Sequence, residues 1–176
     1  ADGANLTEIH RPEDLVPGQM RRWNDAWRLS QCGDAVAPGL LREFGGKRIV
    51  WRTYPVDGER PCVLTTTVQA SSKKQSLDLC VAADAGADSG WGLRVYANDE
   101  LIEQRVVSSE GGRLRWQPVH CEITAAAPAT IRLEHRADGR SQATGYWAYA
   151  RLTAATEAKP VECTAPESAI EVDAPD

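Results

Sequence analysis

Apolar and polar residues alternate with a period of two along much of this chain, most clearly in WGLRVYANDELIEQRVV at 91–107. Such alternation is typical of β-strands that bury one face. Asn98 and Asp99 interrupt it, and both tolerate the positive φ that a two-residue hairpin turn requires. The loop length predicts four cross-strand pairs: Val95–Ile102, Trp91–Val106, Arg94–Glu103 and Tyr96–Leu101. This register predicts a half-buried β-hairpin in which only Gln104 is misplaced, on the apolar side.

The rest of the chain shows the same pattern in shorter pieces. Besides the hairpin, the predicted strands cover 23–31, 48–54, 61–70, 76–83, 114–124, 129–136 and 145–153. Residues 35–47 contain one proline and three glycines, which predicts a loop with at most one turn of helix at 39–44. Eight or nine short strands, without a convincing helix of ten residues, predict an all-β antiparallel sandwich or barrel.

The two ends of the chain lack this periodicity. We expect an irregular lead-in over 1–22, a β-sandwich domain over 23–155, and a tail over 156–176 rich in Pro, Ala and Glu. Residues 1–10 lack the basic and apolar regions of a signal peptide, and we expect any such segment to have been removed already. Nothing approaches the roughly 18 apolar residues that a membrane-spanning helix needs, so we expect no membrane partner.

The charge of the chain argues against nucleic acid as a partner. The formal net charge is −5 and the pI is about 5.3, so the long-range field repels phosphates. RLRW at 113–116 is a local basic cluster with an aromatic residue, but a solvated strand end explains it more simply.

Three stretches together resemble the galactose-binding-domain-like jelly rolls that serve as carbohydrate-binding modules, including those called NPCBM. The stretches are SLDLCVAADAGADSGWGLRVYANDELIEQRVV, ATIRLEHRADG and GYWAYARL. The family has a hairpin of the form V-x-V-N-G-x-x-V, where this chain has Ala97-Asn98-Asp99 in place of the Asn-Gly turn. The resemblance covers roughly residues 63 to 152. It implies a jelly roll in which loops carry sugar binding, although jelly rolls host many activities.

Aromatic residues are the first candidates for a sugar site, because six tryptophans accompany a single phenylalanine. Sugar rings stack their C–H faces on indole and phenol rings, and their hydroxyls need planar polar partners. The predicted ligand-binding residues are Trp116, Arg136, Asp138, Arg140, Tyr146, Trp147 and Tyr149. Trp116 is the best candidate for an exposed ring, beside a proline and two arginines. The alternative reading places Trp147 in the core and leaves Tyr149 as a surface ring. Trp51 and Trp91 fall in phase with aliphatic neighbours, so we expect them to lie in the core.

The acidic loop at 84–89 is a candidate calcium site. Asp84 and Asp88 supply carboxylates, and the loop adds a hydroxyl and backbone carbonyls, which suit a hard cation. Two carboxylates are too few, so the site would need a further ligand such as Asn98 or Glu157. The alternative is a plain solvated turn.

Two arrangements would suit an enzyme. Glu122 and Glu134 lie on predicted strands and point away from the apolar rows, so pairing of those strands would bring two carboxylates to glycosidase spacing. His135 with Tyr146 and Arg136 would instead suit a polysaccharide lyase. The alternative is ordinary salt-bridging to neighbouring arginines, and no G-x-S-x-G, HExxH or phosphate-loop motif is present.

We therefore predict a non-catalytic module that binds carbohydrate or another extracellular polymer. It would be secreted, periplasmic or on the cell surface, either as a protein of its own or as a module cut from a longer chain. The competing hypotheses are a structural or protein-interaction domain without a sugar site and, third, a jelly-roll glycosidase or lyase.

Five cysteines at 32, 62, 80, 121 and 163 occur without a CxxC pair, which argues against zinc. Cys62 and Cys121 share phase with apolar residues and are expected to be buried thiols. Cys80 lies out of phase with its apolar neighbours. The preferred pairing is Cys32–Cys163, which would tie both ends of the chain together outside a reducing cytosol. The alternatives are Cys80–Cys163 and five free thiols.

Overall fold

The computed structural model describes residues 26–34, 38–86, 90–138 and 143–154, together with Cys163. Within those residues the chain forms ten strands and no helix. The described residues therefore contain no helix that could cross a membrane. The strands are β1 (Arg28–Gln31), β2 (Gly39–Phe44), β3 (Lys47–Thr53), β4 (Cys62–Val68), β5 (Gln75–Ala83), β6 (Gly90–Ala97), β7 (Glu100–Ser108), β8 (Gln117–Ile123), β9 (Ala129–Ala137) and β10 (Gly145–Ala154).

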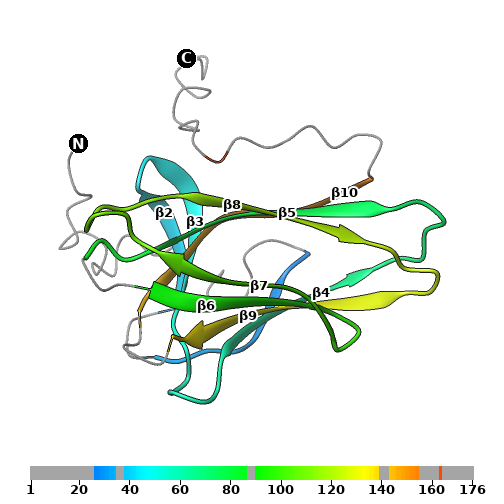
Figure 1. The fold of residues 1–176 in the computed structure, drawn as a ribbon, viewed down its shortest axis with the longest axis horizontal. Coiled ribbons are helices and arrows are strands. Elements are labelled where there is room, and N and C mark those ends of the chain that lie inside the picture. The colour runs from blue at the N-terminus through cyan, green and yellow to red at the C-terminus, as the bar shows by residue number, and fades with distance from the viewer. Residues whose placement is uncertain (1–25, 35–37, 87–89, 139–142, 155–162, 164–176) are drawn as a thin grey trace.

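The strands form two antiparallel five-stranded sheets that pack face to face. One has the order β1-β4-β9-β6-β7 and is called the β9 sheet below; the other has the order β2-β3-β10-β5-β8 and is called the β10 sheet. In Figure 1 the β10 sheet is the upper layer and the β9 sheet the lower one. The predicted all-β antiparallel sandwich is confirmed.

The core lies between the two sheets and is filled by the inward-facing residue of each alternating pair. Along β5, for example, Leu77, Leu79 and Val81 point inward and are fully buried. Four tryptophans anchor this core, each at most 1% exposed: Trp27, Trp51, Trp91 and Trp147. The prediction that Trp51 and Trp91 are core residues is therefore confirmed.

The prediction for residues 39–44 is wrong, because this stretch is strand β2 and not a loop with a helical turn. It pairs with β3 from Gly39–Arg52 to Phe44–Lys47. Gly45 and Gly46 connect the two strands with φ values of 57° and 76°. Two successive positive φ values are those of a tight hairpin turn. The Gly-Gly pair therefore joins two strands, whereas the sequence pattern predicts irregular structure at this point.

The hairpin at 91–107 is confirmed as β6 and β7, with Asn98 and Asp99 at φ 46° and 67° in the turn. Tyr96 faces Leu101 as predicted, but a bulge follows and shifts the remaining pairs by one residue. The shifted pairs include Val95–Glu103, Arg94–Gln104 and Trp91–Val107.

The shift corrects the one mismatch of the predicted register. It turns the side chain of Gln104 outward, and it buries Val107 while leaving Val106 53% exposed. Val107 thus occupies the core position opposite Trp91 that the predicted register assigns to Val106.

Candidate functional site

The outer face of the β9 sheet collects polar and aromatic side chains from strands that are far apart in the sequence. In the β4–β9–β6 part of the sheet, Thr65 pairs with Arg132, which pairs with Tyr96. In the next row of residues that face outward, two positions along each strand, Val63 pairs with Glu134, which pairs with Arg94. We call the set the outer polar face: Arg28, Thr65, Thr67, Arg94, Tyr96, Thr130, Arg132, Glu134 and Arg136.

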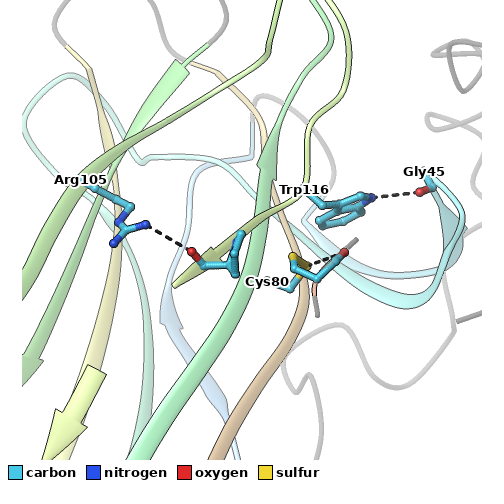
Figure 2. The surroundings of a disulfide bond; sticks show 6 residues. Gly45, Cys80, Arg105 and Trp116 are labelled. Carbon is cyan, nitrogen blue, oxygen red and sulfur yellow. Dashed lines mark hydrogen bonds between the residues drawn. A yellow bond between two sulfur atoms is a disulfide. The ribbon is translucent and has the colours of Figure 1, made fainter. Parts of the chain in front are cut away.

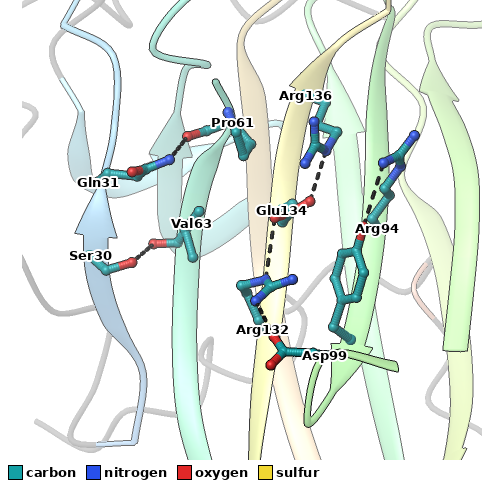
Figure 3. Close-up of polar contacts among 10 residues, drawn as sticks. Ser30, Gln31, Pro61, Val63, Arg94, Asp99, Arg132, Glu134 and Arg136 are labelled. Carbon is teal, nitrogen blue, oxygen red and sulfur yellow. Dashed lines mark hydrogen bonds and ion pairs between the residues drawn. The ribbon is translucent and has the colours of Figure 1, made fainter. Parts of the chain in front are cut away.

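Glu134 is the centre of this face, and Figure 3 shows it between two arginines of the same strand. Arg136 Nε donates to Glu134 Oε1 at 2.8 Å, and Arg132 Nε forms an ion pair with Oε2 at 3.3 Å. The side chain of Glu134 is only 6% exposed, against 32% and 30% for the arginines. A carboxylate buried to this degree needs such partners, so the pair of contacts fixes both guanidinium groups on the face.

Tyr96 lies beside this cluster. The guanidinium of Arg132 lies 4.3 Å from the centre of its ring, which is a cation–π contact. Arg94 Nη1 lies 3.5 Å from the Tyr96 hydroxyl, and Arg132 Nη1 donates to Asp99 Oδ1 at 2.7 Å. The half-buried ring of Tyr96 is therefore covered on one face by the guanidinium of Arg132 and contacted at its hydroxyl by Arg94, and the carboxylate of Asp99 lies close by.

A groove of about 500 Å³ adjoins this cluster. It is lined by Ala26, Arg28, Thr65, Thr66, Thr67 and Thr130. The register places Thr65 between Arg28 on β1 and Arg132 on β9, so the groove and the Tyr96 cluster share one surface. Hydroxyls, guanidinium groups and a ring thus lie side by side over β1, β4, β9 and β6.

Comparison with solved structures relates this fold to known modules. The chain superposes on the CBM22-1 xylan-binding domain of Xyn10C from Paenibacillus barcinonensis with a TM-score of 0.54 at 9% identity, over 77% of this chain and 90% of that one. A family 35 carbohydrate-binding module from an environmental isolate gives 0.50 at 13% identity, over 80% and 92%. The K1 cleaved adhesin domain of Lys-gingipain from Porphyromonas gingivalis W83 gives 0.53 at 11% identity, over 77% and 95%.

The fold is a jelly roll similar to those of these two carbohydrate-binding modules. No protein-family model and no curated protein sequence matches the chain, and identities this low relate the fold alone.

Within this jelly-roll fold, the three aromatic rings predicted to bind sugar from the last strand are buried. Tyr146 and Trp147 are fully buried and Tyr149 is 7% exposed. Trp147 fills the core between the sheets, whereas Tyr146 stacks on Phe44 at 3.9 Å on the outer side of the β10 sheet. The alternative reading is correct in placing Trp147 in the core and wrong in making Tyr149 a surface ring.

Trp116 is half-buried and is not the freely exposed ring that was predicted. Its Nε1 donates to the carbonyl of Gly45 at 2.9 Å (Figure 2), and its ring meets Phe44 edge-on at 6.2 Å. Trp116 therefore fastens the segment before β8 to the β2–β3 turn.

The other predicted ligand-binding residues have different outcomes. Arg136 lies on the outer polar face, paired to Glu134. Asp138 is exposed just beyond the end of β9, on the side where β6 begins, because Gly90 is its neighbour. Arg140 lies outside the described residues.

Asp84 of the predicted calcium loop is engaged in hydrogen bonds. Its two oxygens accept the hydroxyl of Tyr146 at 2.9 Å and the backbone N–H of Thr144 at 3.1 Å. Asp88 and Glu157 lie outside the described residues, and Asn98 lies at the far end of β6, about 25 Å along the strand from this loop. Within the described part of the chain, no three His, Cys, Asp or Glu residues gather as a metal site would need.

The two arrangements considered for catalysis do not form. Glu122 lies on β8 in the β10 sheet, paired to Lys74 at 3.2 Å, whereas Glu134 lies on β9 in the other sheet. The strands that carry the two glutamates therefore do not pair, and the condition for a glycosidase spacing is not met. His135 is fully buried, and desolvation lowers its pKa to about 3, so it is unsuited to take a proton from a substrate.

The preferred disulfide is also wrong, because Cys163 bonds to Cys80 and Cys32 is free. Cys80 faces outward from β5, on the side opposite its apolar neighbours, so its bonded partner Cys163 lies on this outer surface of the β10 sheet. Both residues of the bond are buried, at 0% and 1% exposure. The alternative pairing is the correct one, and the out-of-phase position of Cys80 was its signal.

The sequence does contain the residue pattern of the outer polar face. The pattern is divided between two strands, so neither strand alone indicates the face. Arg132, Glu134 and Arg136 alternate with apolar residues on β9, and Arg94 and Tyr96 do so on β6. The two rows become one surface only because β6 and β9 are neighbours. That pairing joins segments some 40 residues apart, and short-range periodicity does not report it.

Proposed function

We propose that this chain is a non-catalytic carbohydrate-binding module that binds a polysaccharide along its outer polar face. The observation that carries the proposal is the half-buried ring of Tyr96, flanked by Arg94 and Arg132 and continuous with a threonine-lined groove. A sugar needs an aromatic surface for its C–H face and planar polar groups for its hydroxyls. This face supplies both, whereas the tryptophans of the core supply neither.

The charge of the face favours a polysaccharide that carries carboxylates. In the described part of the chain, four arginines of the face accompany two acids that pair with them, Glu134 and Asp99. Among the described residues, Arg28 and Arg94 have no carboxylate partner. Guanidinium groups bind carboxylates in a planar, two-pronged manner. We expect acidic chains such as alginate or polygalacturonate to bind more tightly than neutral ones such as xylan.

The Cys80–Cys163 bond supports a location outside a reducing cytosol, which suits a module that meets extracellular polysaccharides. A competing function is protein interaction. It is favoured by Leu101 and Val106, which are 44% and 53% exposed on β7 at the edge of the same sheet. An edge strand with exposed aliphatic residues can receive a partner strand.

Affinity electrophoresis in gels containing alginate, polygalacturonate, xylan or hydroxyethylcellulose tests the proposal. We expect the wild-type chain to be retarded most by an acidic polysaccharide. Tyr96→Ala removes the stacking surface and Arg132→Ala removes the adjoining cation. Each change should raise the dissociation constant about tenfold, equivalent to roughly 1.4 kcal/mol.

The matched control is Arg115→Ala, which removes an exposed arginine that pairs with Glu110 at 3.7 Å, outside the outer polar face. Its binding should equal that of the wild type. Retardation by none of the four polysaccharides, or equal losses in Arg115→Ala and Arg132→Ala, would contradict the proposal. Retardation by neutral chains alone would keep the site and reject the charge preference.

A further inference from the structure

Cys32 and Cys62 are cross-strand neighbours that no bond joins in this structure. The β1–β4 ladder ends with Gln31 opposite Val63, and one further antiparallel step places Cys32 opposite Cys62. Residues directly opposite in an antiparallel pair have Cα atoms about 4.5–5.5 Å apart, which lies within the range that disulfides span. The two thiols are close enough to shift each other's pKa.

The backbone holds this pair in place. Cys32 Sγ donates to the carbonyl of Tyr54 at 3.3 Å, and Gly33 N–H donates to the same oxygen at 2.9 Å. Gly33 makes this approach feasible, because a Cβ there would lie 2.1 Å from the carbonyl oxygen of Pro55. Cys32 is thus fixed by contacts of its own side chain and of the next residue.

We propose that Cys32 and Cys62 are a dithiol site that closes to a second disulfide by exchange with a small-molecule disulfide such as oxidised glutathione. Cys32 is half-buried and reachable from solvent, whereas Cys62 is fully buried. The sulfur of Cys32 attacks one sulfur of the oxidant, and a mixed disulfide forms as the first thiolate leaves.

The sulfur of Cys62 then attacks Cys32, and the second thiolate leaves. The two protons lost by the cysteines go to the two leaving thiolates, so one oxidant yields two thiols. The environment of the pair suits this order. The hydrogen bond with Cys62 lowers the pKa of Cys32, and burial raises the pKa of Cys62, which makes Cys32 the first nucleophile.

The bond would clamp β1 to the sheet. β1 is a four-residue edge strand whose ladder is irregular between Leu29 and Gln31. Side chains help to hold it, since Ser30 donates to the carbonyl of Val63 and Gln31 to that of Pro61 (Figure 3). β1 also supplies Arg28 to the groove. A Cys32–Cys62 disulfide directly after β1 would hold Arg28, and with it this wall of the groove, in place.

Counting thiols tests the proposal. The protein, with Cys80–Cys163 intact, is incubated with oxidised glutathione, denatured without reductant and alkylated, and its intact mass is measured. Of the five cysteines, we expect only Cys121 to be modified. Peptide mapping should then recover a fragment that links Cys32 to Cys62. Three modified cysteines after oxidation, or a link from Cys121 to either thiol, would overturn the proposal.

Two variants test whether Cys32 and Cys62 react in sequence with glutathione or are only close together. Cys62→Ser lacks the second thiol, so glutathione should remain attached to Cys32 as a stable mixed disulfide. Cys121→Ser should still close the pair and leave no modifiable cysteine. If Cys62→Ser fails to fold, the wild-type peptide map decides alone.

Discussion

His135 shows how a buried polar residue is accommodated in the core of this sandwich. Its Nδ1 lies 2.9 Å from the hydroxyl of Thr53, which also accepts the indole N–H of Trp147 at 2.8 Å. Gly145 gives this chain of contacts its space, since a Cβ there would lie 2.7 Å from His135 Nδ1. A neutral imidazole fits this environment, and a charged one does not.

We expect His135 to make the fold less stable in mild acid. Desolvation lowers its pKa in the folded chain from 6.5 to about 3. Between those values the unfolded chain binds a proton that the folded chain does not, so stability is fully present above pH 6.5 and falls as the pH drops. From pH 7 to pH 5 the free energy of unfolding should fall by about 2 kcal/mol from this residue alone. Urea unfolding at both values measures it.

The variant His135→Gln separates titration from packing. It should be less stable than the wild type at pH 7, because it loses the ring contact with Trp91 at 4.3 Å. Its stability should nevertheless change less between pH 7 and pH 5. An equal loss in both proteins over that interval would show that His135 is not the titrating group.

Among the elements, turns and bulges were harder to infer from sequence than strands. The period of two located most strands, because each buries one face. It could not reveal the bulge that moves Val107 into the core, since a bulge adds one residue and inverts the alternation beyond it. It also missed β2, whose alternation is weak because Leu40 and Leu41 are both buried, one in each of two apolar clusters.

The Gly45-Gly46 turn gives a test at this scale. Gly45 has φ 57°, and a Cβ on it would lie 2.3 Å from Leu114 Cδ2 and 3.1 Å from Trp116 Nε1. Gly45→Ala should therefore lower the free energy of unfolding by roughly 1 kcal/mol, because alanine is strained in the left-handed conformation. Displacing Leu114 should lower it further. The substitution should also weaken the hydrogen bond from Trp116 to the Gly45 carbonyl.

Gly111 is the matched control, because its φ is also 57° but a Cβ on it meets nothing within 4 Å. Gly111→Ala should lower the free energy of unfolding only by the strain of a left-handed alanine. Urea unfolding should rank Gly45→Ala below Gly111→Ala in stability by about 1 kcal/mol or more. Equal stabilities would mean that Leu114 moves aside freely and that the segment before β8 does not depend on this turn.

At the scale of the whole molecule, the class of fold followed from sequence, but the position of the candidate site did not. Tyr146 and Tyr149 are buried on the outer side of the β10 sheet, a surface that a single-strand pattern assigns to solvent. Leu114, Trp116 and Cys163 pack on that side. The outer polar face depends on a long-range pairing of β6 with β9. Periodicity reports which residues share a face, whereas sheet order and the segments packed outside each sheet decide which face is open.

The Cys80–Cys163 bond connects the centre of β5 to a residue beyond the last strand, across 83 positions. Closing so long a loop restricts the unfolded chain, so the bond should stabilise the fold by about 4–5 kcal/mol on the chain-entropy account. The double variant Cys80→Ala/Cys163→Ala should unfold at a markedly lower urea concentration. It should retain polysaccharide binding at low temperature, because the bond lies on the β10 sheet and the outer polar face on the other. Cys121→Ala, which removes a buried thiol without a bond, controls for lost packing and should cost less. An equal loss in the two variants would mean that packing around Cys80, rather than the covalent link, stabilises this surface.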